Sequence, residues 1–439
     1  MSVRLMDVDP AGTPVGPSLY ERVKHELHTE LVTSLDPSVL RTTSRPELEA
    51  QLRLRLATTV HSRELPITRS EQERIVDEIV DEILGLGPLE RLLRATDTTD
   101  ILVNGPNTIY VERGGHLELS DVHFRDEEHL RNVIDRIVSR VGRRIDESMP
   151  MVDARLADGS RFHAIIPPLA LDGASVSIRR FGVNPIRRED LLRLGSIPEA
   201  AMRLLDGCVR AKLNILVSGG TGSGKTTLLN VLTASIPKDE RVITIEDAAE
   251  LRLQQPHVVR LETRPPNLEG AGEVTTRDLV RTALRMRPDR ILVGEIRGLE
   301  AIDMLQAMNT GHEGSISTIH ANSPRHALSR LETMVGLGMG NIPSSAIREM
   351  IAEAIDLVIQ VNRNSDGHRR VTSLTEITGI SGNIIATQEV FRFHQRTVET
   401  DGRVRGTFES TGVRPDFAAR FSACGLDLPA ELLSIHEEV

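Results

Sequence analysis

The sequence predicts an α/β fold in which a large domain with a mostly parallel sheet follows a smaller α+β domain and an N-terminal helical segment. In the C-terminal half, apolar runs alternate with helical stretches, as in a parallel sheet; these runs are 215–217, 242–246, 258–262 and 291–294. Between 100 and 181, turn residues instead separate short apolar segments, a pattern typical of strands joined by tight turns. The 439 residues, 39% of them hydrophobic, are enough for about three domains.

The N-terminal part is expected to be helical after a flexible tail. Residues 1–17 are rich in Pro and Gly, which disfavour regular structure. Helical patterns over 19–34 and 46–62 then define a helical segment at 18–66. A third helix is expected to start at Ser70, because Glu73 follows at the spacing of a capping box.

The α+β domain is expected at 70–181. The third helix of the chain, which opens this domain, should end at Gly85. An amphipathic helix with apolar positions from Leu130 to Val141 should follow. The segment Ala157-Asp158-Gly159-Ser160 has the composition of a hairpin turn. The expected strands are 101–103, 109–111, 152–156, 161–166 and 175–181.

A linker at 182–190, opening near Asn184-Pro185, is expected to lead into the last domain, 191–439. A helix should follow Pro343 and run to about Ala354. The expected later strands are 357–361, 371–376 and 384–393. The last 40 residues contain several Gly and a Pro, and are expected to form an irregular extension that closes with a short helix.

Composition excludes some functions. The net charge of −10 argues against a general nucleic-acid binder, and no Phe, Tyr or Trp occurs between 182 and 390 to stack on bases. Two cysteines, Cys208 and Cys424, are too few for a Cys₄ zinc site and fit a reducing compartment. No apolar run approaches about 18 residues. A cytoplasmic protein is therefore expected, with membrane contact only through partners.

A glycine-rich segment organises the last domain. It follows the apolar run 215–217, precedes a helical pattern, and matches G-x-x-x-x-G-K-[ST]. Glycines let backbone N–H groups point at phosphate oxygens, Lys225 would reach the β- and γ-phosphates, and Thr226 would offer its hydroxyl to Mg²⁺. The alternative is a glycine loop that only turns a corner. The expected nucleotide-binding residues are Gly219, Gly220, Thr221, Gly222, Ser223, Gly224, Lys225, Thr226 and Thr227.

Carboxylates end two of the predicted strands. Glu246 ends the run 242–246, and Glu295 follows 291–294. In such sheets ligands bind beyond the carboxyl ends of strands, so both acids should lie near the phosphates. There they could hold Mg²⁺, in part through water, and orient the attacking water. Surface acids are the alternative. Asp247 and Glu250 are weaker candidates, because they could also cap the next turn.

Two histidines, His312 and His320, flank a short apolar segment. A histidine near the γ-phosphate could respond to the difference between ATP and ADP, because its charge changes near neutral pH. A single histidine is more often structural, so a structural role for either residue stays open.

Longer motifs resemble those of secretion ATPases. The run 281–297 resembles their Walker B region, 304–323 their His box, and 245–251 their Asp box. An ordinary Walker B strand ends in Asp, whereas Gly294 stands there in this chain. The segments 152–161 and 261–270 resemble the CpaF branch, which powers assembly of Flp/Tad pili. The resemblance covers about residues 75–435.

This resemblance implies a homo-hexameric ATPase that uses ATP and Mg²⁺, with an N-terminal domain hinged to a RecA-like core. It implies that Glu295 is the catalytic acid and that Glu246 belongs to the water and Mg²⁺ network. It also implies that arginines of the N-terminal domain reach the phosphates, a role that fits Arg155, Arg161 and Arg179; surface arginines on strands are the alternative. The zinc-binding cysteine cluster of the type II secretion relatives is missing.

The implied partners are platform proteins at the cytoplasmic face of the inner membrane, without direct nucleic-acid binding. A conjugation or type IV secretion ATPase would share the fold and the chemistry, so it is the nearest alternative. A nucleic-acid translocase and a scaffold that binds ATP without hydrolysis also stay open. The residues that contact adenine are not evident, since the base would have to rest on aliphatic or arginine surface or on the other domain.

Overall fold

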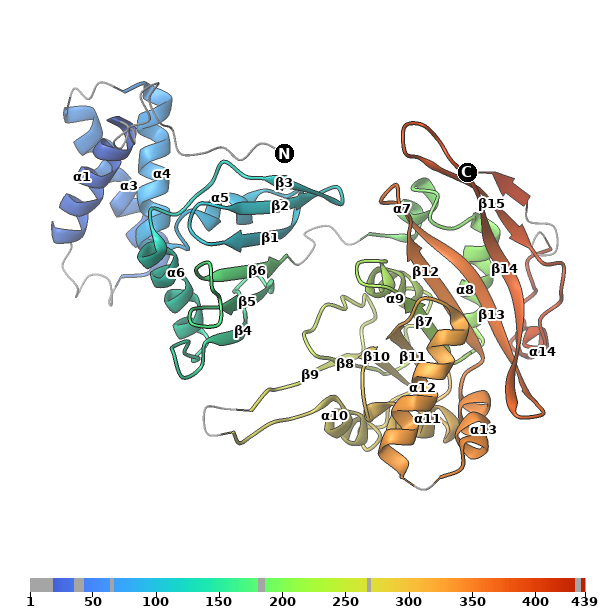
Figure 1. Cartoon of the computed structure of the whole chain (residues 1–439). Coiled ribbons are helices and arrows are strands. Elements are labelled where there is room, and N and C mark those ends of the chain that lie inside the picture. The colour runs from blue at the N-terminus through green and yellow to red at the C-terminus, as the bar shows by residue number, and fades with distance from the viewer. Residues whose placement is uncertain are drawn as a thin grey trace. The chain divides into compact units, whose positions relative to one another are not determined.

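The computed structural model describes residues 19–34, 43–63, 67–180, 186–266, 270–340, 342–430 and 436–438. The chain divides into two compact units, 1–183 and 184–439, and each is described by itself (Figure 1). The tail expected at 1–17, and residues 182–185 of the expected linker, lie outside the described residues. Residues 188–190 of that linker belong to a helix instead.

Among the described residues, the first unit begins with three helices that pack together. Their apolar faces meet in one buried cluster, which includes Leu27, Leu52 and Ile79. The helices are α1 (Leu19–Ser34), α3 (Arg45–Ser62) and α4 (Arg69–Leu84). The sequence pattern therefore located these helices correctly.

The start of α4 differs from the expectation. Its N-cap is Thr68, not Ser70, and the capping box pairs Thr68 with Glu71. The backbone N–H of Glu71 donates to Thr68 Oγ1 over 3.3 Å, and the backbone N–H of Thr68 donates to Glu71 Oε2 over 2.7 Å. Thr68 and Glu71 have the same capping-box spacing as Ser70 and Glu73, two positions further along. The helix starts at the earlier of these two pairs.

The rest of the first unit is an antiparallel sheet. In the described residues the strand order is β3-β2-β1-β6-β5-β4. The strands are β1 (Thr98–Asn104), β2 (Ile109–Arg113), β3 (His116–Leu119), β4 (Met151–Arg155), β5 (Arg161–Ile165) and β6 (Ser175–Arg179). The accompanying helices are α5 (Leu89–Arg94) and α6 (Glu127–Arg140). The hairpin expected at 157–160 joins β4 to β5.

The second unit is built on one large mixed sheet. In the described residues its order is β16-β15-β14-β13-β12-β7-β11-β10-β8-β9. The strands from β12 to β9 in this order are parallel, and the others are antiparallel. The parallel strands are β7 (Ile215–Gly219), β8 (Val242–Glu246), β9 (Val258–Glu262), β10 (Arg290–Ile296), β11 (Ile316–His320) and β12 (Leu357–Arg363). The remaining strands are β13 (Arg369–Ser381), β14 (Ile384–Val398), β15 (Val404–Ser410) and β16 (His436–Glu438).

Helices cover both faces of this sheet, as the predicted α/β fold requires (Figure 1). One buried cluster contains residues of α8, α9 and α14 together with strand residues such as Val217. The other contains residues of the four helices α10, α11, α12 and α13 together with strand residues such as Leu216. These helices are α7 (Arg188–Arg193), α8 (Glu199–Arg210), α9 (Lys225–Thr233), α10 (Thr276–Ala283), α11 (Glu300–Asn309), α12 (Pro324–Met339), α13 (Ser344–Ala354) and α14 (Ala418–Ala423).

The C-terminal extension is more regular than expected. Strand β15 pairs with β14 along its length, and β16 pairs with β15. The prediction of an irregular piece is therefore wrong for residues 404–410 and 436–438. Gly406 explains the misleading signal: a Cβ at this position would lie 2.3 Å from the ring of Phe393, so the glycine marks close packing within a strand.

Candidate nucleotide-binding site

The glycine-rich loop joins the end of β7 to the start of α9. Gly222 and Gly224 have φ values of 67° and 99°, which a residue with a side chain rarely adopts. Gly219 is restricted by space, because a Cβ there would lie 2.4 Å from the carbonyl oxygen of Val361 and 2.5 Å from Ser223 Oγ. The loop therefore has the strand, glycine turn and helix start that bind phosphate in P-loop proteins.

Lys225 lies at the first position of α9 and turns back over the loop. Its Nζ donates hydrogen bonds of 3.1 Å to the carbonyl oxygens of Gly219 and Gly220. Burial lowers the pKa of Lys225 below its ordinary value of 10.5; nearby Glu295 opposes this shift and Arg297 adds to it. Thr226 and Thr227 follow in the first helical turn, half-buried. The cation is therefore held where the phosphates of a nucleotide would lie.

Glu246 ends β8 and is almost fully buried, with 4% of its surface exposed. Its Oε2 accepts hydrogen bonds from the backbone N–H groups of Glu250, over 2.7 Å, and Leu251, over 2.9 Å. Burial raises the pKa of Glu246, although these two hydrogen bonds act in the opposite direction. Its Oε1 is buried without a partner among the described residues. One oxygen thus fixes the turn after β8, and the other is available to a ligand.

Glu295 lies near the end of β10, next to Gly294. Its Oε2 accepts hydrogen bonds from Arg297, over 2.8 Å from Nε and 2.5 Å from Nη2. The same guanidinium donates to Asp247 Oδ2 over 2.9 Å. Arg297 therefore joins the ends of β10 and β8. The sequence left two roles open for Asp247, an acid of the site or a cap of the next turn. In the structure, Asp247 is the second carboxylate that accepts a hydrogen bond from Arg297.

The order of the strands determines how far each acid lies from the phosphate loop. From β7 outward on this side come β11, β10 and β8. With about 4.8 Å between neighbours, β10 lies about 10 Å from β7 and β8 about 14 Å. Glu295 is close enough to Lys225 to affect its pKa. The structure therefore brings together Lys225 and Glu295 as expected, with Glu246 one strand further away.

The two histidines lie at opposite ends of β11. His320 pairs in register with Gly219, at the edge that carries the phosphate loop. His312 precedes the strand, where its carbonyl oxygen accepts a 2.8 Å hydrogen bond from Ser315 Oγ. The strand has five residues and spans about 13 Å. Within one chain, the structure therefore brings His320 to the edge of the phosphate loop and leaves His312 at the opposite edge.

The residues at this edge fit Mg²⁺. Magnesium is bound by one or two carboxylates together with substrate phosphates and waters. Thr226 supplies a hydroxyl beside the phosphate loop, and Glu246 supplies a buried carboxylate oxygen without a partner among the described residues. Among those residues no group of three His, Cys, Asp or Glu side chains could hold a metal alone. The Thr226 hydroxyl and the Glu246 carboxylate therefore suit a Mg²⁺ ion whose remaining ligands are the phosphates of a nucleotide and waters.

The three predicted arginines lie in the first unit. Arg155 pairs in register with Arg161, and Arg161 with Arg179, so they form one row across β4, β5 and β6. Arg179 Nε donates to Asp100 Oδ1 over 3.1 Å, and Arg155 Nε donates to the carbonyl oxygen of Gly159 over 3.2 Å. Cross-strand partners share one face of a sheet. The three cationic side chains are thus gathered on one face.

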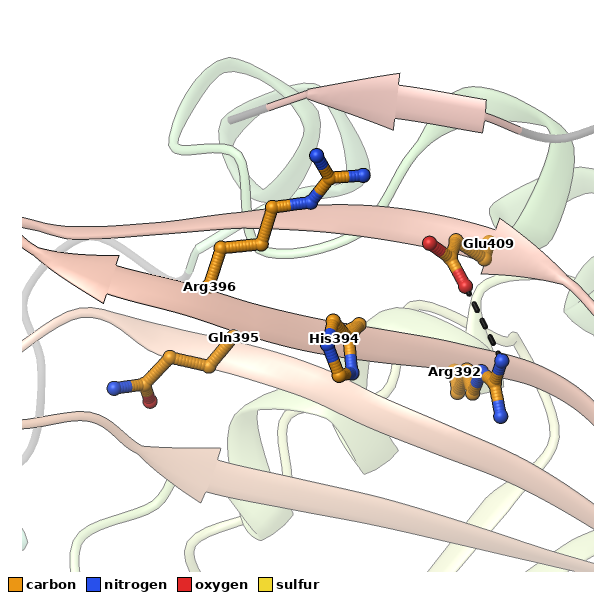
Figure 2. A pocket seen from close by; sticks show the side chains of 5 residues that line it. All are labelled: Arg392, His394, Gln395, Arg396 and Glu409. Carbon is orange, nitrogen blue, oxygen red and sulfur yellow. Dashed lines mark hydrogen bonds and ion pairs between the residues drawn. The ribbon is translucent and has the colours of Figure 1, made fainter.

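A shallow pocket on the antiparallel part of the second unit, of about 490 Å³, contains none of the predicted site residues (Figure 2). It lies over β14 and β15, and Arg392 forms an ion pair with Glu409 over 3.3 Å within it. Its lining residues are Arg392, His394, Gln395, Arg396 and Glu409.

Sequence reasoning missed three arginines at the phosphate loop. Arg297, the partner of Glu295, could have been found from the sequence, because it follows Glu295 by two residues in the same motif. Arg363 and Arg369, at the ends of β12 and β13, lie against Gly222 and Gly224. They had no local signal, because their position depends on the pairing of β12 with β7.

A glycine-rich phosphate loop at the carboxyl edge of a parallel sheet, with acids ending the neighbouring strands, defines a P-loop nucleotide-binding protein with a RecA-like core. The chain belongs to the type II/IV secretion system protein family, whose model matches residues 82–405. Among the helices that the structure describes, none is long and apolar enough to pass through a bilayer.

Known relatives include transfer proteins of two bacteria. The "Putative conjugal transfer protein" of Mycobacterium tuberculosis H37Rv is 42% identical over 311 residues, which cover 70% of this chain and 88% of the relative. Conjugal transfer protein TrbB of Rhizobium radiobacter is 31% identical over 309 residues, 70% and 90% of the two chains. The crystal structure of the VirB11 ATPase from the Brucella suis type IV secretion system, with sulphate, is 32% identical, covers 65% of this chain and 91% of that one, and has a TM-score of 0.35.

Proposed function

We propose that this chain hydrolyses ATP to ADP and phosphate with Mg²⁺, and that it powers a type IV secretion or conjugal transfer machine. The observation that carries the chemistry is the position of Glu295, near the end of β10 and within electrostatic reach of Lys225. The biological setting is supported by the names of the relatives, which refer to conjugal transfer and type IV secretion.

Each residue at the edge of the sheet has a role in this proposal. The backbone N–H groups of 219–224 and the Lys225 ammonium bind the phosphates. Thr226 and Glu246 would hold Mg²⁺, which neutralises charge on the phosphates. Glu295 orients a water molecule and accepts its proton as the oxygen attacks the γ-phosphorus and the bond to ADP breaks. His320 lies at the same edge and would respond to the presence of the γ-phosphate.

Arginines complete the site in this proposal. Arg155, Arg161 and Arg179 form a row on one face of the first unit, and a cation at the transferred phosphoryl group is a strong catalytic contribution. Arg297 is a positioning residue, because it holds the carboxylate of Glu295. The domain boundaries inferred from the sequence, an α+β domain at 70–181 and an ATPase domain at 191–439, belong to this proposal.

The proposed assembly is a homo-hexamer that acts on platform proteins at the cytoplasmic face of the inner membrane, without direct contact to nucleic acid. Assembly of a Flp/Tad-type pilus is a second candidate function. It is supported by the resemblance of 152–161 and 261–270 to the CpaF branch. Identification of the membrane proteins that copurify with the chain would separate the two settings.

The chemistry is tested with two variants of the full chain. Glu295→Gln keeps the shape of the side chain, so we expect ATP affinity near that of the wild type and phosphate release lower by at least about a hundredfold. Lys225→Ala removes the cation of the phosphate loop and should weaken ATP binding itself. Wild-type turnover in Glu295→Gln would remove this residue from the mechanism, and unchanged ATP affinity in Lys225→Ala would contradict the phosphate-loop assignment.

A further inference from the structure

We propose that the hairpin between β12 and β13 forms the nucleoside side of the nucleotide site, with the Arg363 guanidinium as the surface for the purine base and with Arg369 fixing the phosphate loop. This inference rests on the proposed function, because it takes ATP and ADP as the ligands. It adds the part of the site that the sequence motifs leave unassigned.

Strand pairing brings this hairpin to the phosphate loop. Strand β12 runs parallel to β7, and Val361 pairs in register with Gly219, the first glycine of the loop. Two residues further along, Arg363 pairs with Arg369 on β13. Both arginines therefore lie just beyond the carboxyl end of β7, at the level where the chain turns through the loop.

Arg369 is hydrogen-bonded to the loop, and the Arg363 side chain lies near it. Arg369 Nε donates a 2.8 Å hydrogen bond to the carbonyl oxygen of Gly222. A Cβ on Gly224 would lie 3.4 Å from Arg369 Cδ, and a Cβ on Gly222 would lie 3.9 Å from Arg363 Nη1. The glycines thus leave room for the arginines, and Arg369 restrains the loop that binds phosphate.

The direction of the triphosphate follows from the order of the strands. The acids that would face the γ-phosphate, Glu295 and Glu246, lie on β10 and β8, on one side of β7. Strands β12 and β13, with the two arginines, lie on its other side. A bound nucleotide whose γ-phosphate points to the acids therefore directs its nucleoside toward the hairpin.

Arginine is suited to this position. A purine base packs well on a flat side chain, and the second unit has no Phe, Tyr or Trp before Phe391. A guanidinium is planar and stacks on aromatic rings through cation–π contact. Lysine would provide the charge without the flat face.

The turn between β12 and β13 is held in place by contacts with β15 and with the start of β13. Asp366 Oδ2 accepts a 3.0 Å hydrogen bond from the backbone N–H of Val404, on β15, and forms a buried ion pair with Arg370 over 3.3 Å. Within the turn, the backbone N–H of Asn364 donates to the carbonyl oxygen of His368 over 2.8 Å. These contacts hold the strand ends that carry Arg363 and Arg369.

The test compares ADP with inorganic tripolyphosphate, which has phosphates but no nucleoside. Calorimetric titration of the full chain in Mg²⁺ buffer measures both affinities. For Arg363→Ala we expect about a tenfold loss of ADP affinity and no more than a twofold change for tripolyphosphate. Arg363→Lys should show the same selective loss. For Arg369→Ala both affinities should fall, because the phosphate loop loses a restraint.

Arg392→Ala is the matched control, since Arg392 lies on β14 of the same sheet and is paired with Glu409; it should change neither affinity. Unchanged ADP affinity in Arg363→Ala, or an equal loss for both ligands, would overturn the inference. A wild-type chain that binds neither ligand would instead overturn the proposed function, and the inference with it. If the wild-type chain binds both ADP and tripolyphosphate, the Arg363 variants test the inference independently of the proposed function.

Discussion

Gly294 leaves the space that the Glu246 side chain occupies. The two residues follow register-paired positions on β10 and β8, and a Cβ on Gly294 would lie 3.0 Å from Glu246 Cγ. An ordinary Walker B strand ends in Asp at this position, and the close approach of Glu246 gives a physical reason for the glycine here. It lets a buried carboxylate approach the neighbouring strand, while Glu295 at the next position provides the acid of β10.

Gly294→Ala should therefore disturb Glu246. The added methyl is too close to the buried side chain, and we expect a loss of about 1–3 kcal/mol in the free energy of unfolding. ATP hydrolysis should fall at least tenfold. Urea denaturation and phosphate release measure the two effects. Gly336→Ala is the control, because its Cβ would meet only Ile347 Cδ1, at 3.7 Å, within helix α12; it should be neutral or stabilising. Equal behaviour of the two variants would contradict this account.

Arg297→Gln should lower kcat while ATP affinity changes little. The guanidinium holds the carboxylate of Glu295 through two hydrogen bonds, and without them the acid is free to move. Asp247→Asn keeps the pairing of Glu295 with Arg297 and should have a smaller effect on kcat. Steady-state kinetics on both variants measure the difference. If Asp247→Asn were the more damaging change, the role of Arg297 as a positioning residue would have to be abandoned.

Asp366→Asn should destabilise the protein by an amount that is constant near neutral pH and shrinks only in acid. Burial alone would raise the pKa of Asp366, but hydrogen bonds from the backbone N–H groups of Val404 and His368, together with Arg370, lower it below 3.8. Because the folded-state pKa lies below that of the unfolded chain, the stabilisation is complete above about pH 3.8 and is lost as the pH falls through the folded-state value. Urea unfolding should give a difference of about 1 kcal/mol from wild type, constant between pH 8 and 5. A difference that grew as the pH fell would have the wrong sign.

Much of the fold could be predicted from local patterns. The apolar periodicity located helices such as α1, and the rule that ligands bind at the carboxyl edge of parallel strands located Lys225, Glu246 and Glu295 at one edge. Two local patterns misled. The capping spacing occurs twice near α4, and the glycines near β15 resemble those of a loop although Gly406 lies under the ring of Phe393.

The rest of the site depends on contacts between distant parts of the chain. Arg369 and its partner Gly222 are 147 residues apart, and only the pairing of β12 with β7 brings them together. His312 and His320 looked equivalent because both flank one apolar segment. The direction of β11 separates them, since only the residue at the carboxyl end can reach the phosphate loop within one chain.

Arg161→Gln tests the proposed role of the first unit in catalysis. Arg161 is the middle member of the row formed with Arg155 and Arg179. If this row stabilises charge on the transferred phosphoryl group, kcat should fall by about a thousandfold, with little change in ADP affinity. Arg143→Gln is the control, because Arg143 is a partly exposed arginine of the same unit that donates to the carbonyl oxygen of Asp153. Equal rates in the two variants would leave the arginine row without a catalytic role.

The most direct test of an oligomeric ATPase is the rate of Mg²⁺-dependent phosphate release per subunit, measured as the protein concentration rises, with light scattering on the same samples. We expect the rate per subunit to increase as hexamers appear, because the proposed motor acts as a ring. Full activity in a monomer, with no change in rate on assembly, would contradict the account.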